Sequence, residues 1–395
     1  MIVGVFCALD AILFYVFWEG MLVPMYLSIG MWGSANRSYA SIKFFLFTFL
    51  GSLLMLVALV YLYHQASSFL TQDFYGLPLD FPTQRWIFLP FLLAFAVKVP
   101  MWPVHTWLPD AHTEAPAGGS VVLAALMLKL GVYGFLRLSM PVTPLACAEL
   151  SGFMIGLSLV AIVYIGLIAI VQSDMKKLIA YSSIAHMGFA TLGCFMVYQI
   201  IANTRLLQDA YMSLEGAVIQ MVAHAFGSGA MFLGIGLMAD RFYNHSRLIK
   251  DYGGVAHTMP IFAAFFMLFA MSNVGLPGTA GFVGEFMVIL SAFQSHFWVA
   301  AFAATTLVLS SSYTLWMYKR VFFGPIGNQH VAQFSDITWA EKINYILLTI
   351  GVFFVGLYPQ SLIHVLRVTI GHLLLISIPT NLALNIPGQF EVFFA

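Results

Sequence analysis

The feature that most constrains this chain is the recurrence of apolar runs long enough to cross a lipid bilayer. A transmembrane helix needs about 20 mostly apolar residues, and about ten such runs follow one another here. Soluble domains carry about a quarter charged residues, whereas only 8% of these 395 residues are charged. We therefore predict an all-α polytopic membrane protein with about ten transmembrane helices. The runs lie near residues 9–32, 39–63, 86–108, 120–139, 145–171, 175–198, 211–238, 260–293 and 298–322, and the tenth begins near residue 343.

The third run is interrupted beside a charged residue. Lys98 lies within it, and Pro100 and Pro103 follow at once. Proline cannot donate a backbone hydrogen bond, so the carbonyls of Ala96 and Val99 lose their helical partners. A broken helix at membrane depth is tolerated only where protein or water satisfies the freed groups, and a charge at that depth is costly. A lysine beside a helix break therefore indicates an ion path through the protein.

The eighth run is interrupted as well. Residues 273–281 contain Gly275, Pro277 and two further glycines, and Glu285 follows the interruption. The two interrupted runs are five helices apart, so they cross the membrane in opposite directions. Paired Gly/Pro interruptions in two antiparallel halves indicate an inverted-repeat transporter with its site near the midplane.

This pattern divides the chain into three parts. We predict a first, incomplete repeat half over residues 1–140 and a second repeat half over residues 141–324. Residues 325–395 are predicted to hold a loop, the last transmembrane helix and a C-terminal tail that lies on the membrane surface. Residues 1–7 are apolar from the start and read like the end of an earlier membrane helix rather than a signal peptide. We therefore expect that N-terminal helices of the fold are missing.

Positive charges orient the predicted helices. Ten of the 16 Lys and Arg residues fall in loops on one side and four on the other, and two more, Lys98 and Lys129, lie within runs. Because Lys and Arg gather in cytoplasmic loops, the side with ten is predicted to be cytoplasmic, with both chain ends outside. The cytoplasmic set is Arg37, Lys43, Lys176, Lys177, Arg241, Arg247, Lys250, Lys319, Arg320 and Lys342. The outer set is Arg85, Arg137, Arg205 and Arg367.

Few ionisable side chains fall within the predicted spans, and they mix carboxylate, ammonium and imidazole groups. No single metal prefers that mixture. Each group can hold or release a proton, so we interpret them as a proton relay. The candidate residues are Glu19, Lys98, Lys129, His186, His224 and Glu285.

These residues also have structural interpretations. Glu285 could cap backbone amides that the break frees, and the two histidines of the set could be core residues. Lys98 lies too deep in its run to reach the interface easily. His105 and His112 flank the third run in a polar turn, where a surface position fits the sequence as well as an access role. A passive membrane scaffold would leave the buried lysines and carboxylates unexplained.

Other chemistry has no support in the sequence. Cys7, Cys147 and Cys194 lie in apolar runs without paired spacing, so we predict no metal site, cluster or disulfide from them. Neither a phosphate-binding glycine loop nor iron–sulfur spacing occurs. A net charge of zero gives no sign of nucleic-acid binding. We therefore expect no cofactor and no metal in this chain.

Several segments resemble the antiporter-like membrane subunits of proton-pumping NADH:quinone oxidoreductase, respiratory complex I. The motifs are FAVKVP at 95–100, WLPDAHTEAP at 107–116, LMLK at 126–129, DMKKLIAYSSIAHMG at 174–188 and LPGTAGFVGEF at 276–286. The resemblance extends from about Leu9 to Gly324. The segment WEGMLVPMY at 18–26, and glutamate rather than lysine at position 285, resemble the M-type, the counterpart of mitochondrial subunit 4.

The resemblance implies a fourteen-helix subunit with two inverted five-helix repeats, of which this chain lacks about the first three helices and most of the fourth. It also implies that NADH, FMN, iron–sulfur clusters and quinone bind to partner subunits. The implied partners are other membrane subunits of complex I, especially the two other antiporter-like subunits, and the lipid bilayer. By the same resemblance, Glu19 and Lys98 act as a switch, Lys129, His186 and His224 transfer protons centrally, and Glu285 is the outlet.

Three related functions are compatible with this sequence. The chain could be a proton-translocating subunit of NADH:quinone oxidoreductase, whose enzyme activity belongs to the whole complex, or a subunit of a multisubunit cation/proton antiporter or a membrane-bound hydrogenase. Glu285 and the M-type motifs favour the first. The predicted location is the bacterial inner (plasma) membrane, multi-pass, with the mitochondrial inner membrane as the alternative.

Overall fold

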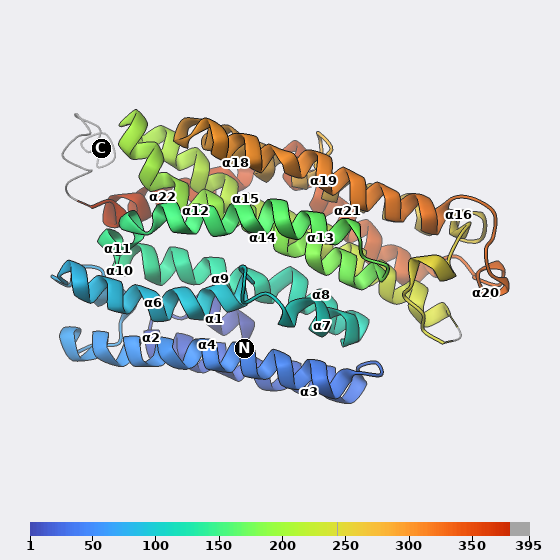
Figure 1. The fold of residues 1–395 in the computed structure, drawn as a ribbon, viewed down its shortest axis with the longest axis horizontal. Helices are drawn as coiled ribbons and strands as arrows, with labels where there is room; N and C mark the ends of the chain where they lie inside the picture. Colours follow the sequence, from blue (N-terminus) through green and yellow to red (C-terminus); the bar gives the residue numbers. More distant parts are fainter. Residues whose placement is uncertain (243, 380–395) are drawn as a thin grey trace.

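The computed structural model describes residues 1–242 and 244–379. Helices run side by side along the long axis of the molecule (Figure 1). Within the described ranges the only β pairing consists of two isolated bridges, Asp10–Leu70 and Asp174–Leu248. The predicted all-α membrane fold is therefore confirmed.

Nine helical runs in the described part of the chain are long and apolar enough to cross a membrane, and eight of them coincide with predicted spans. Three of these eight are composite. The first joins α2 (Ala11–Gly20) to α3 (Leu22–Trp32), and the second runs through α8 (Ala117–Val122), η1 (Leu123–Met127), α9 (Leu128–Gly134), η2 (Phe135–Ser139) and α10 (Met140–Val142). The third runs through α12 (Ser151–Val160), η3 (Ala161–Ile165) and α13 (Gly166–Ile170). The other five are α4 (Arg37–Ala66), α14 (Met175–Thr204), α15 (Leu207–Arg241), α19 (Phe297–Phe322) and α21 (Trp339–Leu357).

The predicted break in the third span begins at Lys98. Helix α6 (Phe81–Lys98) ends there, and α7 (Trp107–Glu114) restarts after an irregular segment. The carbonyl of Ala96, which Pro100 leaves without a helical donor, accepts a hydrogen bond from the Met101 amide at 2.7 Å. The next carbonyl, that of Val97, accepts one from the indole Nε1 of Trp107 at 2.9 Å. The restarted helix thus satisfies the backbone that the break frees.

The break in the eighth span separates α17 (Pro260–Val274) from α18 (Ala280–Ser295). Gly275 has φ +84°, a left-handed conformation that glycine adopts without strain, and its amide donates back into the last turn of α17. The preceding Asn273 is buried, and its Nδ2 donates to Ser182 Oγ at 3.1 Å and to Thr314 Oγ1 at 3.0 Å. These bonds fix the end of α17 against α14 and α19.

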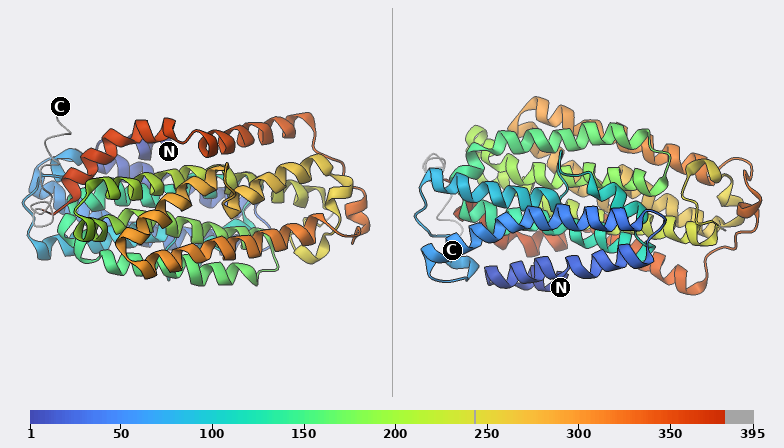
Figure 2. Two further views of the ribbon diagram at one scale, coloured as in Figure 1. Left: turned by 90° about the horizontal axis from the view of Figure 1, so that it is seen from above. Right: turned by 60° about the horizontal axis from the view of Figure 1, so that its bottom comes forward.

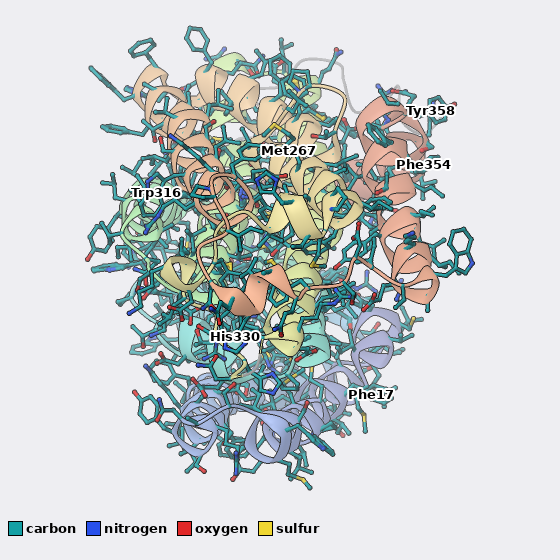
Figure 3. The ribbon with its side chains drawn as sticks, turned by 90° about the vertical axis from the view of Figure 1, so that its right-hand side faces the viewer. Phe17, Met267, Trp316, His330, Phe354 and Tyr358 are labelled. Atoms are coloured by element: carbon teal, nitrogen blue, oxygen red, sulfur yellow. The ribbon has the colours of Figure 1, made fainter. Side chains whose placement is uncertain are left out.

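Helices α14 and α15 form the centre of the bundle. In the most apolar stretch of α14, 94% of the residues are buried. The corresponding share is 72% in α15 and 17% in α21. The periphery carries large apolar side chains instead. Trp316, Phe354 and Tyr358 are exposed on the outside of the bundle, as a lipid-facing surface requires (Figure 3). Polar side chains on α14 and α15 are therefore enclosed by protein rather than by lipid.

The segment after Pro359 differs from its prediction. We expected a tail on the membrane surface, but α22 (Gln360–Ser377) is a helix of spanning length that packs on α15, where Gly371 approaches the hydroxyl of Tyr211. It follows α21 nearly end to end along one edge of the bundle (Figure 2). Its apolar face is buried at Ile370 and Leu374, so burial of that face fixes it in the bundle. Residues 380–395 of the predicted tail lie outside the described ranges.

The loops predicted to be cytoplasmic meet at one end of the bundle. Arg247 there contacts Ser34, Glu114 and Asp174, which belong to three other segments of the chain. We call this end the arginine end. Arg85, near the start of α6, contacts Glu149 of α11 (Pro144–Glu149) at the opposite side of the predicted partition. The helix directions therefore agree with the alternation that the sequence predicts.

Candidate functional site

Lys129 and His224 lie in direct contact within the bundle. Lys129 is in α9 (Leu128–Gly134), directly after the π-helical turn η1 (Leu123–Met127). Its Nζ is 2.6 Å from Nδ1 of His224 on α15 and donates to the carbonyl of Ala124 at 2.5 Å. Both side chains are almost fully buried. A π turn inserted into an α-helix is frequently found at functional sites. Here the π turn ends shortly before Lys129, which contacts the imidazole of His224.

His186 and Glu285 continue this contact toward the second break. The ring centroids of His224 and His186 are 5.9 Å apart, and His186 Nδ1 is 2.7 Å from Glu285 Oε1. Nε2 of Gln220, on α15, lies 3.3 Å from the same carboxylate oxygen and 3.5 Å from His186 Nδ1. The structure therefore brings four of the six predicted residues into one buried line.

A small polar cavity lies along this line. Its volume is about 10 Å³, and its lining includes His186, His224, Ser228 and Glu285. A cavity needs about one probe sphere of space to hold a water molecule, and a polar lining favours it. Both imidazole rings line this cavity, and its volume is at the lower limit of what one water molecule occupies.

Glu19 and Lys98 lie in a second group, at the first break. Lys98 is fully buried, and its Nζ lies over the rings of Trp18 and Phe44 at 5.3 and 6.0 Å from their centroids. The Glu19 carboxylate accepts a hydrogen bond from the hydroxyl of Ser52 on α4. The two charges act on each other electrostatically but form no direct ion pair. The structure therefore places Glu19 and Lys98 near each other, but not in direct contact.

The contacts do not support the alternative in which Glu285 caps a helix. Thr279 is the residue before α18, and the Glu285 carboxylate contacts His186 and Gln220 rather than backbone amides of the described chain. Glu285 lies at the sixth position of α18, so its side chain projects from the restarted helix toward α14 and α15. The break thereby places a carboxylate at the end of the histidine pair.

Sequence reasoning missed several buried polar residues. Gln220 carries no charge and gives no signal in a search for ionisable groups. His112 is 0% exposed, and His105 is buried too, so the surface position left open for them is wrong. Lys176, counted among the loop cations, is 4% exposed and donates to the carbonyl of Ala115 at 2.7 Å. In the sequence, the HTEAP turn could have indicated these buried residues, because His112 and Ala115 both lie in it.

Asp174 has a structural role at the start of α14. Its side chain accepts hydrogen bonds from the amides of Lys176 and Lys177 and so caps the start of α14. Its other oxygen lies 3.5 Å from Nε of Arg247. This cap fixes the first turn of α14, from which Lys176 points inward.

Two broken helices with ionisable residues at their breaks are an arrangement typical of ion-translocating membrane proteins. Residues 8–310 match the family model described as NADH:quinone oxidoreductase/Mrp antiporter, transmembrane. NADH-quinone oxidoreductase subunit M of Rhodobacter capsulatus is 47% identical over 94% of this chain and 73% of its own length. NADH-ubiquinone oxidoreductase chain 4 of Marchantia polymorpha is 41% identical over 94% of this chain and 72% of its own length.

Solved structures agree with these relatives. A chain of respiratory complex I from Thermus thermophilus with bound NADH superposes with a TM-score of 0.84 at 30% identity, covering 98% of this chain and 77% of that one. A chain of the membrane-bound sulfane sulfur reductase, an archaeal respiratory membrane complex, has a TM-score of 0.79 at 21% identity and shares the fold. The protein belongs to the NADH:quinone oxidoreductase/Mrp antiporter family of membrane subunits, in its M-type branch. The predicted multi-pass location in a bacterial inner membrane is confirmed by the bacterial relative and the spanning helices.

Proposed function

We propose that this chain translocates protons within a membrane-embedded NADH:quinone oxidoreductase, along the line Lys129–His224–His186–Glu285. The observation that carries the proposal is the continuity of this line. Lys129 touches His224 at 2.6 Å, and His186 touches Glu285 at 2.7 Å. The two imidazole rings between them are 5.9 Å apart. Alternating ammonium, imidazole and carboxylate groups can pass a proton because each accepts it from one neighbour and donates it to the next.

Each step of the proposed transfer leaves a group ready for the next proton. The Lys129 ammonium gives a proton to Nδ1 of His224 and becomes a neutral amine. The proton then moves to His186, directly or through a water molecule in the cavity that both rings line. His186 passes it from Nδ1 to the Glu285 carboxylate, which releases it toward the outer side. Gln220 holds the carboxylate in position for that last transfer, because its Nε2 donates to the same carboxylate oxygen.

Glu19 and Lys98 control the proposed relay from the first break. When Glu19 approaches Lys98, the pair stabilises both charges; when they separate, a buried ammonium without a counter-ion favours release of its proton. In the structure Glu19 is held by Ser52, and Lys98 is surrounded by aromatic rings. The separated arrangement therefore corresponds to the state in which Lys98 gives up its proton.

The driving reaction takes place in partner subunits under this proposal. We assign NADH, FMN, iron–sulfur clusters and quinone to those subunits and propose no redox centre for this chain. The partners include the two other antiporter-like subunits, and the bilayer surrounds the assembly. The identities of 47% and 41% to subunits of NADH dehydrogenases support this assignment over an antiporter or a hydrogenase.

Proton pumping by vesicles that contain the Lys129→Met complex tests this function. Methionine keeps the length of lysine but cannot hold a proton, so we expect NADH-driven acidification to fall at least about tenfold per assembled complex. Lys250→Met is the matched control, because Lys250 is exposed in a loop and lies outside the relay. Acidification by Lys129→Met at the wild-type rate would contradict the proposal.

A further inference from the structure

Arg247 lies in the loop that follows α15, and its backbone is tied to the start of α14. The carbonyl of Arg247 accepts a hydrogen bond from the amide of Met175 at 3.0 Å. The amide of Ile249 donates to the carbonyl of Ser173, also at 3.0 Å. These two bonds form a short antiparallel pairing, so the position of the Arg247 backbone follows that of the first turn of α14.

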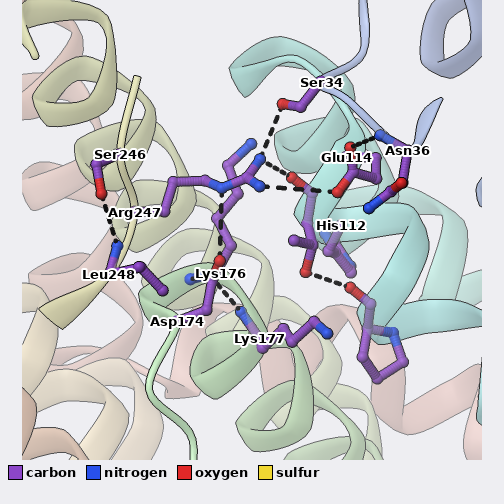
Figure 4. A network of polar contacts seen from close by, with 12 residues as sticks. Ser34, Asn36, His112, Glu114, Asp174, Lys176, Lys177, Ser246, Arg247 and Leu248 are labelled. Atoms are coloured by element: carbon purple, nitrogen blue, oxygen red, sulfur yellow. Dashed lines mark hydrogen bonds and ion pairs between the residues drawn. The ribbon is translucent and has the colours of Figure 1, made fainter. Parts of the chain in front are cut away.

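The side chain of Arg247 extends from this pairing to the first repeat half. Its guanidinium donates to Ser34 Oγ at 2.9 Å and to the carbonyl of Thr113. It also lies 3.7 Å from Glu114 Oε1 and 3.5 Å from Asp174 Oδ2 (Figure 4). A guanidinium presents five donors in a rigid planar fork, so one arginine can hold several groups at fixed positions. We call Arg247, Glu114 and Asp174 the arginine clasp.

The clasp is more enclosed than an ordinary surface ion pair. The side chains of Arg247, Glu114 and Asp174 are 17%, 9% and 13% exposed. Fully exposed ion pairs contribute little because water and salt screen them, whereas partly buried pairs are screened much less. The clasp can therefore hold the segments that it joins.

Glu114 is also bound to the loop between α3 and α4. Its Oε2 accepts a hydrogen bond from the amide of Asn36, and its carbonyl accepts one from the amide of Ser34, both at 3.0 Å. The backbones approach closely there, because a Cβ atom at Gly33 would lie 2.9 Å from the Glu114 carbonyl oxygen. The end of α7 is thus fixed from two sides.

The two helices that the clasp joins belong to different parts of the proposed mechanism. Helix α7 restarts after the first break, which begins at Lys98, and Glu114 is its last residue. Helix α14 is capped by Asp174 and carries His186 of the relay. Arg247 therefore connects a helix adjoining the switch to a helix that holds a relay imidazole.

We propose that Arg247 is a positioning residue that carries displacement of α7 to α14 and so couples the switch to the relay. This inference rests on the proposed function. When Glu19 and Lys98 pair or separate, the irregular segment after Lys98 changes conformation, and α7 moves with it as a rigid unit. The clasp transmits that movement to α14. His186 is then shifted against Glu285, and their 2.7 Å contact is short enough for a small shift to make or break it.

The test is the number of protons translocated per electron that passes from NADH to quinone, measured in vesicles that contain the assembled complex. Arg247→Met removes the guanidinium and keeps the apolar stem. We expect the proton-to-electron ratio to fall at least about twofold, because electron transfer continues in partner subunits while the relay no longer follows the switch. The loss should be partial, since Lys176 of α14 still donates to the carbonyl of Ala115, next to the end of α7, at 2.7 Å.

Two further variants make this test specific. Glu114→Gln keeps the shape of the side chain and an acceptor for the amide of Asn36, but it removes the charge that faces the guanidinium. We expect a smaller fall of the ratio in the same direction. Arg37→Met is the matched control, because Arg37 is exposed at the same end and its side chain bonds to the carbonyl of Gly33 in its own segment. Its ratio should equal that of the wild type.

The ratio separates coupling from a purely structural role. An arginine that only stabilises the fold would lower the melting temperature or the amount of assembled complex and leave the ratio unchanged. A wild-type ratio in assembled Arg247→Met complex would therefore overturn the proposal; if that variant does not assemble, Glu114→Gln decides by the same criterion. Fully additive losses in the Arg247→Met/Glu114→Gln double variant would overturn it too, because residues that act through one contact are not additive.

Lys129→Met, measured in the same vesicles, distinguishes failure of this inference from failure of the proposed function. Wild-type pumping by Lys129→Met would contradict the relay itself. Loss of pumping by Lys129→Met, together with a wild-type ratio in Arg247→Met, would leave the relay intact and remove only the coupling through the clasp.

Discussion

The imidazole of His186 and the carboxylate of Glu285 meet at 2.7 Å although they are 99 residues apart in the chain. His186 lies within the continuous helix α14, whereas Glu285 lies on α18, just beyond the second break. Gln220 of α15 contacts both. Because α18 restarts at Ala280, its side chains can enter the space between α14 and α15, so the break joins a carboxylate to the histidine pair.

Close packing at Gly284 maintains this arrangement. A Cβ atom at Gly284 would lie 2.7 Å from the backbone nitrogen of Gln220, which is nearer than real Cβ contacts allow. We predict that Gly284→Ala separates α18 from α15 and destabilises the protein by about 1–3 kcal/mol. The measurements are the melting temperature of the purified complex and its rate of proton pumping, both of which should fall.

Gly156→Ala is the matched control for this substitution. Gly156 lies in helix α12, and no atom lies within 4 Å of its hypothetical Cβ. Alanine is the better helix former by about 1 kcal/mol, so this variant should be at least as stable as the wild type. Equal melting temperatures and pumping rates for the two variants would contradict the packing argument.

Lys98 offers a second test, at the first break. We predict that Lys98→Met abolishes most proton pumping and leaves assembly largely intact. Methionine fits the apolar space between Trp18 and Phe44 but cannot pair with Glu19 or carry a proton. Pumping is measured in vesicles, normalised to assembled complex, with the exposed Lys250→Met variant for comparison. Full pumping by an assembled Lys98→Met complex would refute the switch.

The orientation of the bundle is tested by labelling an engineered cysteine. Asn244 is exposed in the loop that carries Arg241, Arg247 and Lys250, and we predict that this loop is cytoplasmic. Asn244→Cys, in a Cys7→Ser background, should resist an impermeant thiol reagent in intact cells and react in inverted vesicles. Arg205→Cys, exposed in a loop on the other side of the predicted partition, should show the opposite pattern. Ready labelling of Asn244→Cys in intact cells would overturn the helix count.

Much of the fold could be predicted because the bilayer imposes a strong pattern. A helix that crosses the bilayer needs a long apolar run. Because lipid cannot satisfy backbone hydrogen bonds, a helix break is restricted to places where protein covers it. Pro100 and Gly275 therefore locate both breaks within a few residues of where α6 and α17 end. The segment after Pro359 escaped prediction because proline ends a helix, whereas packing of α22 on α15 depends on tertiary contacts.

The candidate site could be predicted only in part. Ionisable residues inside apolar runs stand out in a sequence because a charged side chain is costly to place within the membrane. The four residues of the central line were found in this way. Lys176 and Lys177 are adjacent and identical in type, and only the face of α14 that each occupies separates the buried one from its neighbour. Gln220 is neutral, and only its contacts with His186 and Glu285 show its position. These distinctions come from three-dimensional packing, which a single sequence does not contain.

In the proposed function, protons leave the relay through the carboxylate of Glu285. The most direct measurement is quinone-coupled proton pumping in vesicles by Glu285→Gln and Glu285→Asp complexes, normalised to assembled complex. Glutamine keeps the shape and the hydrogen bonding of glutamate but cannot take up a proton, so we predict at least about a tenfold loss for Glu285→Gln. Glu285→Asp keeps the carboxylate at the cost of one methylene of reach and should retain more activity. Wild-type pumping by Glu285→Gln would refute this outlet, because the carboxylate would then serve only to position His186 and Gln220.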